Sequence, residues 1–107
     1  MFGNLGDMMK ILRDMQANME KAKEELKNER IDVEVGGGMV KLTVNGLGEV
    51  VSLDIDKSLL SEDNKEVLED LIVAAINEAN KRSKEVMAEK MSSIAGLPNI
   101  PGLNNLF

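Results

Sequence analysis

The sequence predicts an α+β fold in which three antiparallel strands lie between two long helices. Apolar residues recur at intervals of three and four on either side of residues 31–56, which is the spacing of one helix face. Within residues 31–56 they alternate with polar residues, as in strands that bury one face. At 107 residues, with 43% apolar and 30% charged side chains, the chain is expected to form one α-β-β-β-α domain over residues 1–95.

The first helix is predicted over residues 4–28. Apolar residues there are spaced alternately three and four apart, a heptad repeat maintained for three periods. They are Leu5, Met8, Leu12, Met15, Met19, Ala22 and Leu26. The chain contains eight Met and only two Phe. Because Met side chains are unbranched and flexible, they suit packing contacts that tolerate imperfect fit.

Three strands are predicted between the helices, over residues 31–36, 39–45 and 49–56. Three consecutive glycines, Gly36 to Gly38, supply the positive-φ positions of the first hairpin, and residues 45–48 supply those of the second. A glycine-rich loop can also bind phosphate, but no Lys-Ser or Lys-Thr pair follows and no helix begins there. The hairpin interpretation is therefore favoured.

The second helix is predicted over residues 62–94. Residues 61–63 suit a helix start through capping and the macrodipole, and an apolar stripe follows with a slip near Ser83. Gly96 and two prolines end the helix. Residues 96–107 are therefore expected to form a flexible tail.

The two helices carry more apolar surface than a small three-stranded sheet can cover. A two-fold homodimer would remove that surface from water. If the helices pack on each other they run antiparallel, and we expect both to meet the sheet at one base and to share a distal tip. That tip would gather six cations: Lys10, Arg13, Lys81, Arg82, Lys84 and Lys90. The alternative is that these side chains only solvate a helix face.

The residue inventory argues against catalysis. The chain contains no His, Cys, Trp or Tyr, so it lacks zinc-finger and redox motifs and any side chain that ordinarily titrates near neutrality. Asp54 and Asp56 share a strand face, but two exposed carboxylates are far more often solvated than metal-bound. We therefore expect no enzyme activity, no cofactor, no metal and no small-molecule substrate.

The charge distribution is uneven along the chain. A formal charge of −6 argues against a general polyanion binder. The segment from Ala79 onward is the exception, with four basic residues against two acidic ones. The start lacks a basic region followed by an apolar run, and nowhere do eighteen apolar residues occur together. We expect a cytoplasmic protein with no membrane partner.

Five segments occur in a recognisable order. They are residues 36–46 (GGGMVKLTVNG), 49–50, 53–56 (LDID), 68–79 (LEDLIVAAINEA) and 96–98 (GLP). Together they resemble the YbaB/EbfC family of bacterial nucleoid-associated proteins over nearly the whole chain. The resemblance implies a tweezer-like homodimer of α-β-β-β-α subunits with protruding helical arms. It also implies binding to double-stranded DNA in the nucleoid, an effect on gene expression, and neither catalysis nor a cofactor.

Two functional hypotheses follow. The first is a dimeric nucleoid-associated protein whose six cations contact the backbone phosphates of double-stranded DNA. Few aromatic residues and no basic recognition helix argue against strict sequence readout. The alternative is a dimeric adaptor that holds another protein through its Met-rich helical seam or through residues 97–107.

Overall fold

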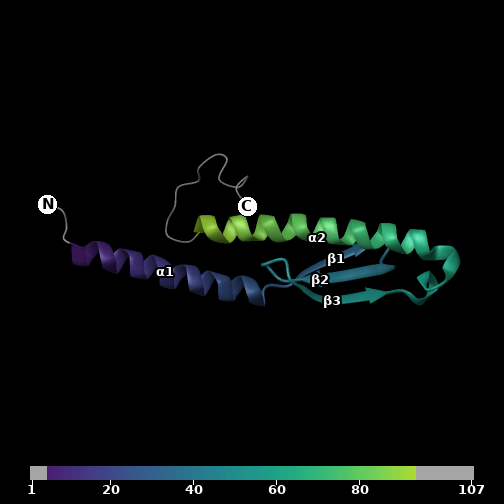
Figure 1. Ribbon diagram of the computed structural model, residues 1–107, viewed down its shortest axis with the longest axis horizontal. Helices are drawn as coiled ribbons and strands as arrows, with labels where there is room; N and C mark the ends of the chain where they lie inside the picture. Colours follow the sequence, from purple (N-terminus) through teal and green to yellow (C-terminus); the bar gives the residue numbers. More distant parts are fainter. Residues whose placement is uncertain (1–4, 94–107) are drawn as a thin grey trace.

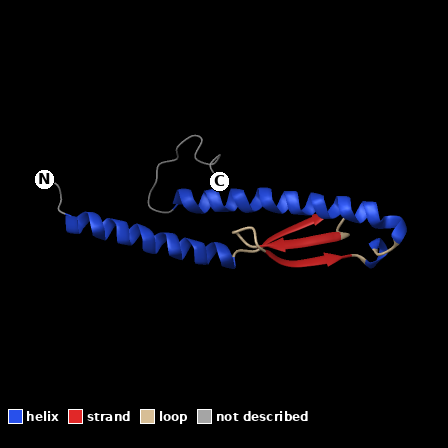
Figure 2. Cartoon of the chain, in the orientation of Figure 1, coloured by secondary structure: helices blue, strands red, loops and turns tan. Residues whose placement is uncertain are grey.

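A computed structural model describes residues 5–93 and shows an elongated two-layer protein (Figure 1). A helix, three antiparallel strands and a long helix follow one another, which confirms the predicted α+β fold (Figure 2). The elements are α1 Leu5–Asn28, β1 Ile31–Val35, β2 Val40–Val44, β3 Val50–Ile55, the 3₁₀ turns η1 Lys57–Leu59 and η2 Glu62–Asn64, and α2 Lys65–Ser93. The Cα atoms extend over 72 × 25 × 16 Å, and α1 projects well beyond the sheet.

The sheet is a meander with the strand order β1-β2-β3. Val33 is opposite Leu42, and Leu42 is opposite Leu53, so apolar residues share one face across the three strands. The glycines at residues 36–38 have φ values of 62°, 68° and 89°, as predicted for the first hairpin. Side chains with a Cβ rarely adopt such angles, which explains why glycine stands at these positions.

The second hairpin uses one of its glycines differently from the prediction. Gly48 has a φ of 85°, whereas Gly46 is outside the positive-φ region. Gly46 is required for space instead, because a Cβ there would lie 2.8 Å from both Cδ2 and the carbonyl oxygen of Leu26. The Gly46 N–H donates to that same carbonyl at 2.7 Å, which fastens the loop to the C-terminal end of α1.

The core lies between α2 and the half of the sheet formed by β1 and β2. The helix approaches closely because its buried row consists of small residues at four-residue intervals: Ala75, Ala79 and Ser83. Ser83 is 5% exposed and its hydroxyl donates to the Asn80 carbonyl at 3.0 Å. The next buried residue of α2 is Ala88, five positions after Ser83, so the four-residue interval changes at Ser83, where the slip was predicted.

The path of the chain decides where α2 begins. An odd number of antiparallel strands ends at the opposite end of the sheet from where it began, so α2 starts far from α1 and runs back across the sheet (Figure 1). Only the last turns of α2 reach α1, near its C-terminal end, and the remainder of α1 projects away from all other described elements. The expectation that both helices meet the sheet at one base and share a distal tip is wrong.

The second helix also begins later than predicted. The Asp56 carboxylate accepts a hydrogen bond from the Ser58 N–H at 2.9 Å, and the Asn64 side chain donates to the Ser58 carbonyl at 2.7 Å. These bonds hold two separate 3₁₀ turns between β3 and α2. Residue 62 therefore belongs to a turn and not to the helix.

The remaining boundaries differ slightly from the prediction. Each strand ends within its predicted range and is shorter by one or two residues. The predicted helix ends at residues 4 and 94, and the predicted tail over residues 96–107, lie outside the described residues.

Candidate nucleic-acid interface

The projecting part of α1, residues 5–19, has one apolar side and one side with charges of both signs, and is called the arm below. Seven apolar side chains, 42–76% exposed, form its apolar stripe: Leu5, Met8, Met9, Ile11, Leu12, Met15 and Met19. Lys10 and Arg13 lie on the opposite side of the helix, and Lys21 continues their line beyond the arm. The prediction of six cations omitted Lys21, although its helical spacing from Lys10 and Arg13 was the signal that could have found it.

Two further cations lie on the outer side of α2. Lys81 and Lys84 are exposed and point away from the buried row that contains Ala79 and Ser83. Within residues 5–93 neither ammonium group takes part in an ion pair or a side-chain hydrogen bond. Both are therefore available to an anionic partner.

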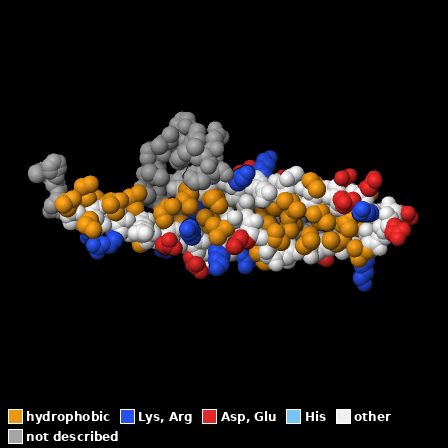
Figure 3. Space-filling model, viewed as in Figure 1, with side chains coloured by type: hydrophobic (Ala, Val, Ile, Leu, Met, Phe, Trp, Pro, Cys, Tyr) orange, Lys and Arg blue, Asp and Glu red, His pale blue; other side chains and the backbone are white. Residues whose placement is uncertain are grey.

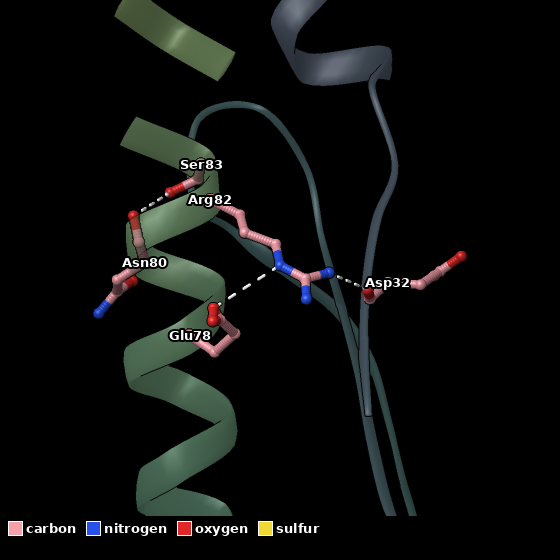
Figure 4. Close-up of polar contacts among 5 residues, drawn as sticks. All are labelled: Asp32, Glu78, Asn80, Arg82 and Ser83. Carbon is pink, nitrogen blue, oxygen red and sulfur yellow. Dashed lines mark hydrogen bonds and ion pairs between the residues drawn. The ribbon is translucent and has the colours of Figure 1, made fainter. Parts of the chain in front are cut away.

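Arg82 is held against the body of the protein (Figure 4). Its Nη1 donates to the Asp32 carbonyl at 3.0 Å, and its Nε lies 3.7 Å from the Glu78 carboxylate. The side chain thus bridges α2 to β1 on one flank of the helix. Half of the side chain is still exposed, but the guanidinium would have to give up these contacts to bind a phosphate with its full set of donors.

Lys90 is engaged at the junction of the two helices. Its Nζ lies 2.9 Å from the Glu25 carboxylate, and only 24% of the lysine side chain is exposed. The hydrogen bond between them, together with their opposite charges, lowers the pKa of Glu25 below its ordinary value of 4.5. The same hydrogen bond raises the pKa of Lys90 above 10.5. Lys90 therefore joins α2 to α1 and is not a free cation.

The six predicted cations do not form one cluster in a single chain. Lys90 marks the place where α2 meets α1, at Glu25. Lys10 precedes Glu25 by fifteen residues, which is about 22 Å along a helix at about 1.5 Å per residue. The cations of the arm are therefore well separated from those of α2, because α2 lies back over the sheet.

The cavity beside this junction is unsuited to an anion. It is lined by Glu29, Val86, Glu89, Lys90 and Ser93, so two carboxylates surround the one lysine. Across residues 5–93, no three carboxylate, His or Cys side chains gather closely enough to hold a metal ion. None of the helices within that range has the length and apolarity required to cross a membrane.

These features define the class of protein. A small two-layer α+β body carries a solitary helix with an exposed apolar stripe and cations on its opposite side, which is the form of an assembly or binding protein. Sequence comparison places it within that class, because the profile of the YbaB/EbfC DNA-binding family matches residues 1–97. The chain belongs to this family.

Relatives and a solved structure agree with that assignment. A nucleoid-associated protein of Persephonella marina is 69% identical over 93 residues, which is 86% of this chain and 84% of the relative. A nucleoid-associated protein of Sulfurihydrogenibium sp. is 61% identical over 97 residues, covering 91% and 88%. The crystal structure of an uncharacterized protein from Helicobacter pylori matches with a TM-score of 0.72 and 32% identity, covering 78% of this chain and 88% of that one.

Proposed function

We propose that this protein is a non-enzymatic homodimer that binds double-stranded DNA in the nucleoid of the cytoplasm, mainly through backbone phosphates. The observation that carries the proposal is membership of a DNA-binding family, supported by two close relatives that are described as nucleoid-associated. Binding of this kind would serve nucleoid organisation and gene regulation.

Phosphate contacts are favoured over base contacts by the side chains that are available. Lys10, Arg13, Lys81 and Lys84 are exposed and make no ion pair within the described residues. These cations are distributed over two helices and are not gathered on one segment that could enter a groove. They therefore suit contacts with backbone phosphates better than contacts with base edges. Because the formal charge of the chain is −6, the protein as a whole repels DNA, and electrostatic attraction to phosphates comes only from these local cations.

Dimerisation is supported by the apolar side chains that the single chain leaves in water. Besides the apolar stripe of the arm, Val50 and Leu53 of β3 are 62% and 48% exposed, and Val73 and Ile76 of α2 are 57% and 44% exposed. Figure 3 shows hydrophobic side chains both on the arm and over the sheet on one face of the molecule. Contiguous apolar surfaces of this kind mark association sites in soluble proteins.

The test measures affinity for random duplex DNA by fluorescence anisotropy over a range of salt concentrations. Each phosphate contact contributes about −0.9 to the slope of log K against log salt, so the double substitution Lys81→Ala and Lys84→Ala should reduce the slope by up to about 1.8 for each protomer that contacts the DNA. The matched control is Lys57→Ala with Lys65→Ala, which removes two exposed lysines, one from η1 and one from the first turn of α2. An equal change in both variants, or no binding by the parent protein at low salt, would count against the proposal.

The adaptor function is the second candidate, and the exposed Met-rich stripe of the arm is the observation that favours it. Its other predicted contact, residues 97–107, lies outside the described residues. Absence of DNA binding at low salt, together with retention of a protein partner that is lost when the stripe is made polar, would select this function.

A further inference from the structure

We propose that the outer side of α2 carries a DNA-backbone contact in which two neutral amides act beside two lysines. The contact, called the α2 patch, consists of Asn77, Asn80, Lys81 and Lys84. This inference rests on the DNA binding proposed above and adds Asn77 and Asn80 to the residues that contact phosphates. It thereby assigns part of the DNA contact to side chains without charge.

The four residues of the α2 patch share one side of the helix. They follow one another at positions i, i+3, i+4 and i+7, which is the spacing of a single helix face. The buried row that contains Ala75 and Ala79 faces the sheet, so the patch lies on the opposite side. All four side chains are exposed, and Figure 4 shows that of Asn80 directed away from β1.

The two amides have no structural role within the described fold. Across residues 5–93 neither side-chain amide has a hydrogen-bond partner, and the Asn80 group that accepts from Ser83 is its backbone carbonyl. Asn is among the weaker helix formers, and charged side chains fill most of the other exposed positions of α2. Two exposed asparagines in the middle of α2 therefore weaken the helix without a compensating contact, which is typical of functional positions.

The charges near the α2 patch favour a phosphate at this place. Residues 77–85 hold three basic and two acidic side chains, which leaves a net charge of +1. One of the acidic residues, Glu78, lies on the flank toward β1, where the Arg82 Nε is 3.7 Å from its carboxylate. The other, Glu85, lies at the edge of the patch, one turn after Lys81.

The patch also has a limit along the helix. Asp70 precedes Asn77 by seven residues, so it lies on the same side of α2, and its carboxylate repels phosphate. The DNA contact is therefore confined to the residues that follow it. From Asn77 to Lys84 the helix rises about 10 Å at about 1.5 Å per residue, which matches about three phosphates of one strand spaced about 3.4 Å along the duplex axis.

Neutral donors suit a protein that is acidic as a whole. A side-chain amide donates two N–H groups, and asparagine is among the residues that contact phosphate oxygens in protein–DNA complexes. Such a contact adds no charge and releases no counterion, so its contribution does not fade as salt is raised. The formal charge of −6 limits what the lysines can contribute, and the amides supplement them.

The experiment compares amide and cationic contacts by fluorescence anisotropy with random duplex DNA over a range of salt concentrations. The double variant Asn77→Ala with Asn80→Ala should bind on the order of tenfold more weakly than the parent at every salt concentration, because two neutral hydrogen bonds are lost. Its slope of log K against log salt should equal that of the parent. The variant Lys81→Ala with Lys84→Ala should instead lose both affinity and slope.

The matched control keeps the amides and changes only their reach. Asn77→Gln with Asn80→Gln retains both groups of N–H donors and should recover most of the affinity that the alanine variant loses. Alanine and glutamine are both stronger helix formers than asparagine, so α2 should be at least as stable in either variant as in the parent. Circular dichroism and sedimentation check that the fold and the assembly are unchanged.

A second experiment tests the position of the patch without relying on affinity. The chain contains no cysteine, so a thiol at Asn77→Cys can carry an aryl azide as the only label. Irradiation with random duplex DNA should yield covalent complexes. The control is Ser52→Cys, which is exposed on the face of the sheet that alternates with the apolar face of Leu53, and it should yield few.

The possible results separate this inference from the function on which it rests. If the parent binds DNA and the alanine variant binds equally well, or if the glutamine variant is as weak as the alanine variant, the amides are not contacts. A flattened salt slope in the alanine variant, or equal cross-linking at residues 52 and 77, would also overturn the inference while leaving DNA binding intact. A parent protein that fails to bind DNA at low salt would refute both.

Discussion

Gly46→Ala should destabilise the protein strongly, because it disturbs the attachment of α1 to the body. A Cβ at residue 46 would lie 2.8 Å from the Leu26 carbonyl oxygen and 3.1 Å from its Cα, and backbone atoms cannot rotate out of the way. Leu26 itself is fully buried. Overpacking of this kind costs about 1–3 kcal/mol, and weakening the 2.7 Å hydrogen bond from Gly46 to Leu26 adds about 0.5–1.5 kcal/mol.

Gly37→Ala is the matched control. No atom lies within 4 Å of a Cβ at residue 37, so the substitution introduces only the strain of its φ of 68°, about 1–2 kcal/mol. Gly46→Ala should therefore be the more destabilising of the two by about 1 kcal/mol or more, a difference of roughly 4–8 °C in Tm per kcal/mol for a domain of this size.

Urea unfolding followed by far-ultraviolet circular dichroism would measure this difference, since the chain has no Trp or Tyr to report by fluorescence. All variants must be compared at one protomer concentration, because the stability of a dimer depends on concentration. If Gly37→Ala proved equally or more destabilising with unchanged m-values, the close approach of the loop to α1 would not be the reason for glycine at residue 46.

Two further predictions concern the same region. Asn45→Ala should lower the free energy of unfolding by about 2 kcal/mol in the same urea titration, because Asn45 Oδ1 accepts from the N–H groups of Leu47 and Glu49 and Asn45 Nδ2 donates to the Glu49 carboxylate. A loss below about 0.5 kcal/mol would contradict this role of Asn45. The stability difference between the parent protein and Glu25→Gln should be fully present above pH 4.5 and should shrink as the pH falls below it, because the pKa of Glu25 is lowered in the folded state. At alkaline pH the same difference should shrink above pH 10.5, because the pKa of Lys90 is raised in the folded state. A difference that stayed constant in unfolding curves from pH 3 to pH 7 would contradict the role of the ion pair.

Much of the candidate site was visible in the sequence as patterns on separate helices. Heptad spacing placed the apolar stripe of α1, and the same periodicity set Lys10 and Arg13 on the side away from it. Lys81 and Lys84 were predicted as cations of the second helix, and the structure leaves both exposed. Helical periodicity is a local property, so it shows which residues share a face without knowledge of the rest of the fold.

The sequence did not show which cations were already engaged. Arg82 donates to the backbone of β1, fifty residues earlier, and Lys90 pairs with Glu25, sixty-five residues earlier. The sequence also did not show why residue 46 is glycine, because the atoms that exclude a side chain there belong to Leu26 and not to the turn itself. Contacts between distant segments depend on how the elements pack, and no spacing along the chain encodes them directly.

The sequence by itself therefore determined the order of the elements, their approximate limits and the apolar face of each one. Only the tertiary structure decided that α2 returns over β1 and β2, that β3 keeps an uncovered side, and that the arm stands apart from α2. The physical reason is that the hydrophobic effect is non-directional. It favours removal of an apolar face from water, but it does not select which of several apolar surfaces covers that face. That choice depends on strand direction, on the small residues that allow close packing, and on the contacts of all elements together.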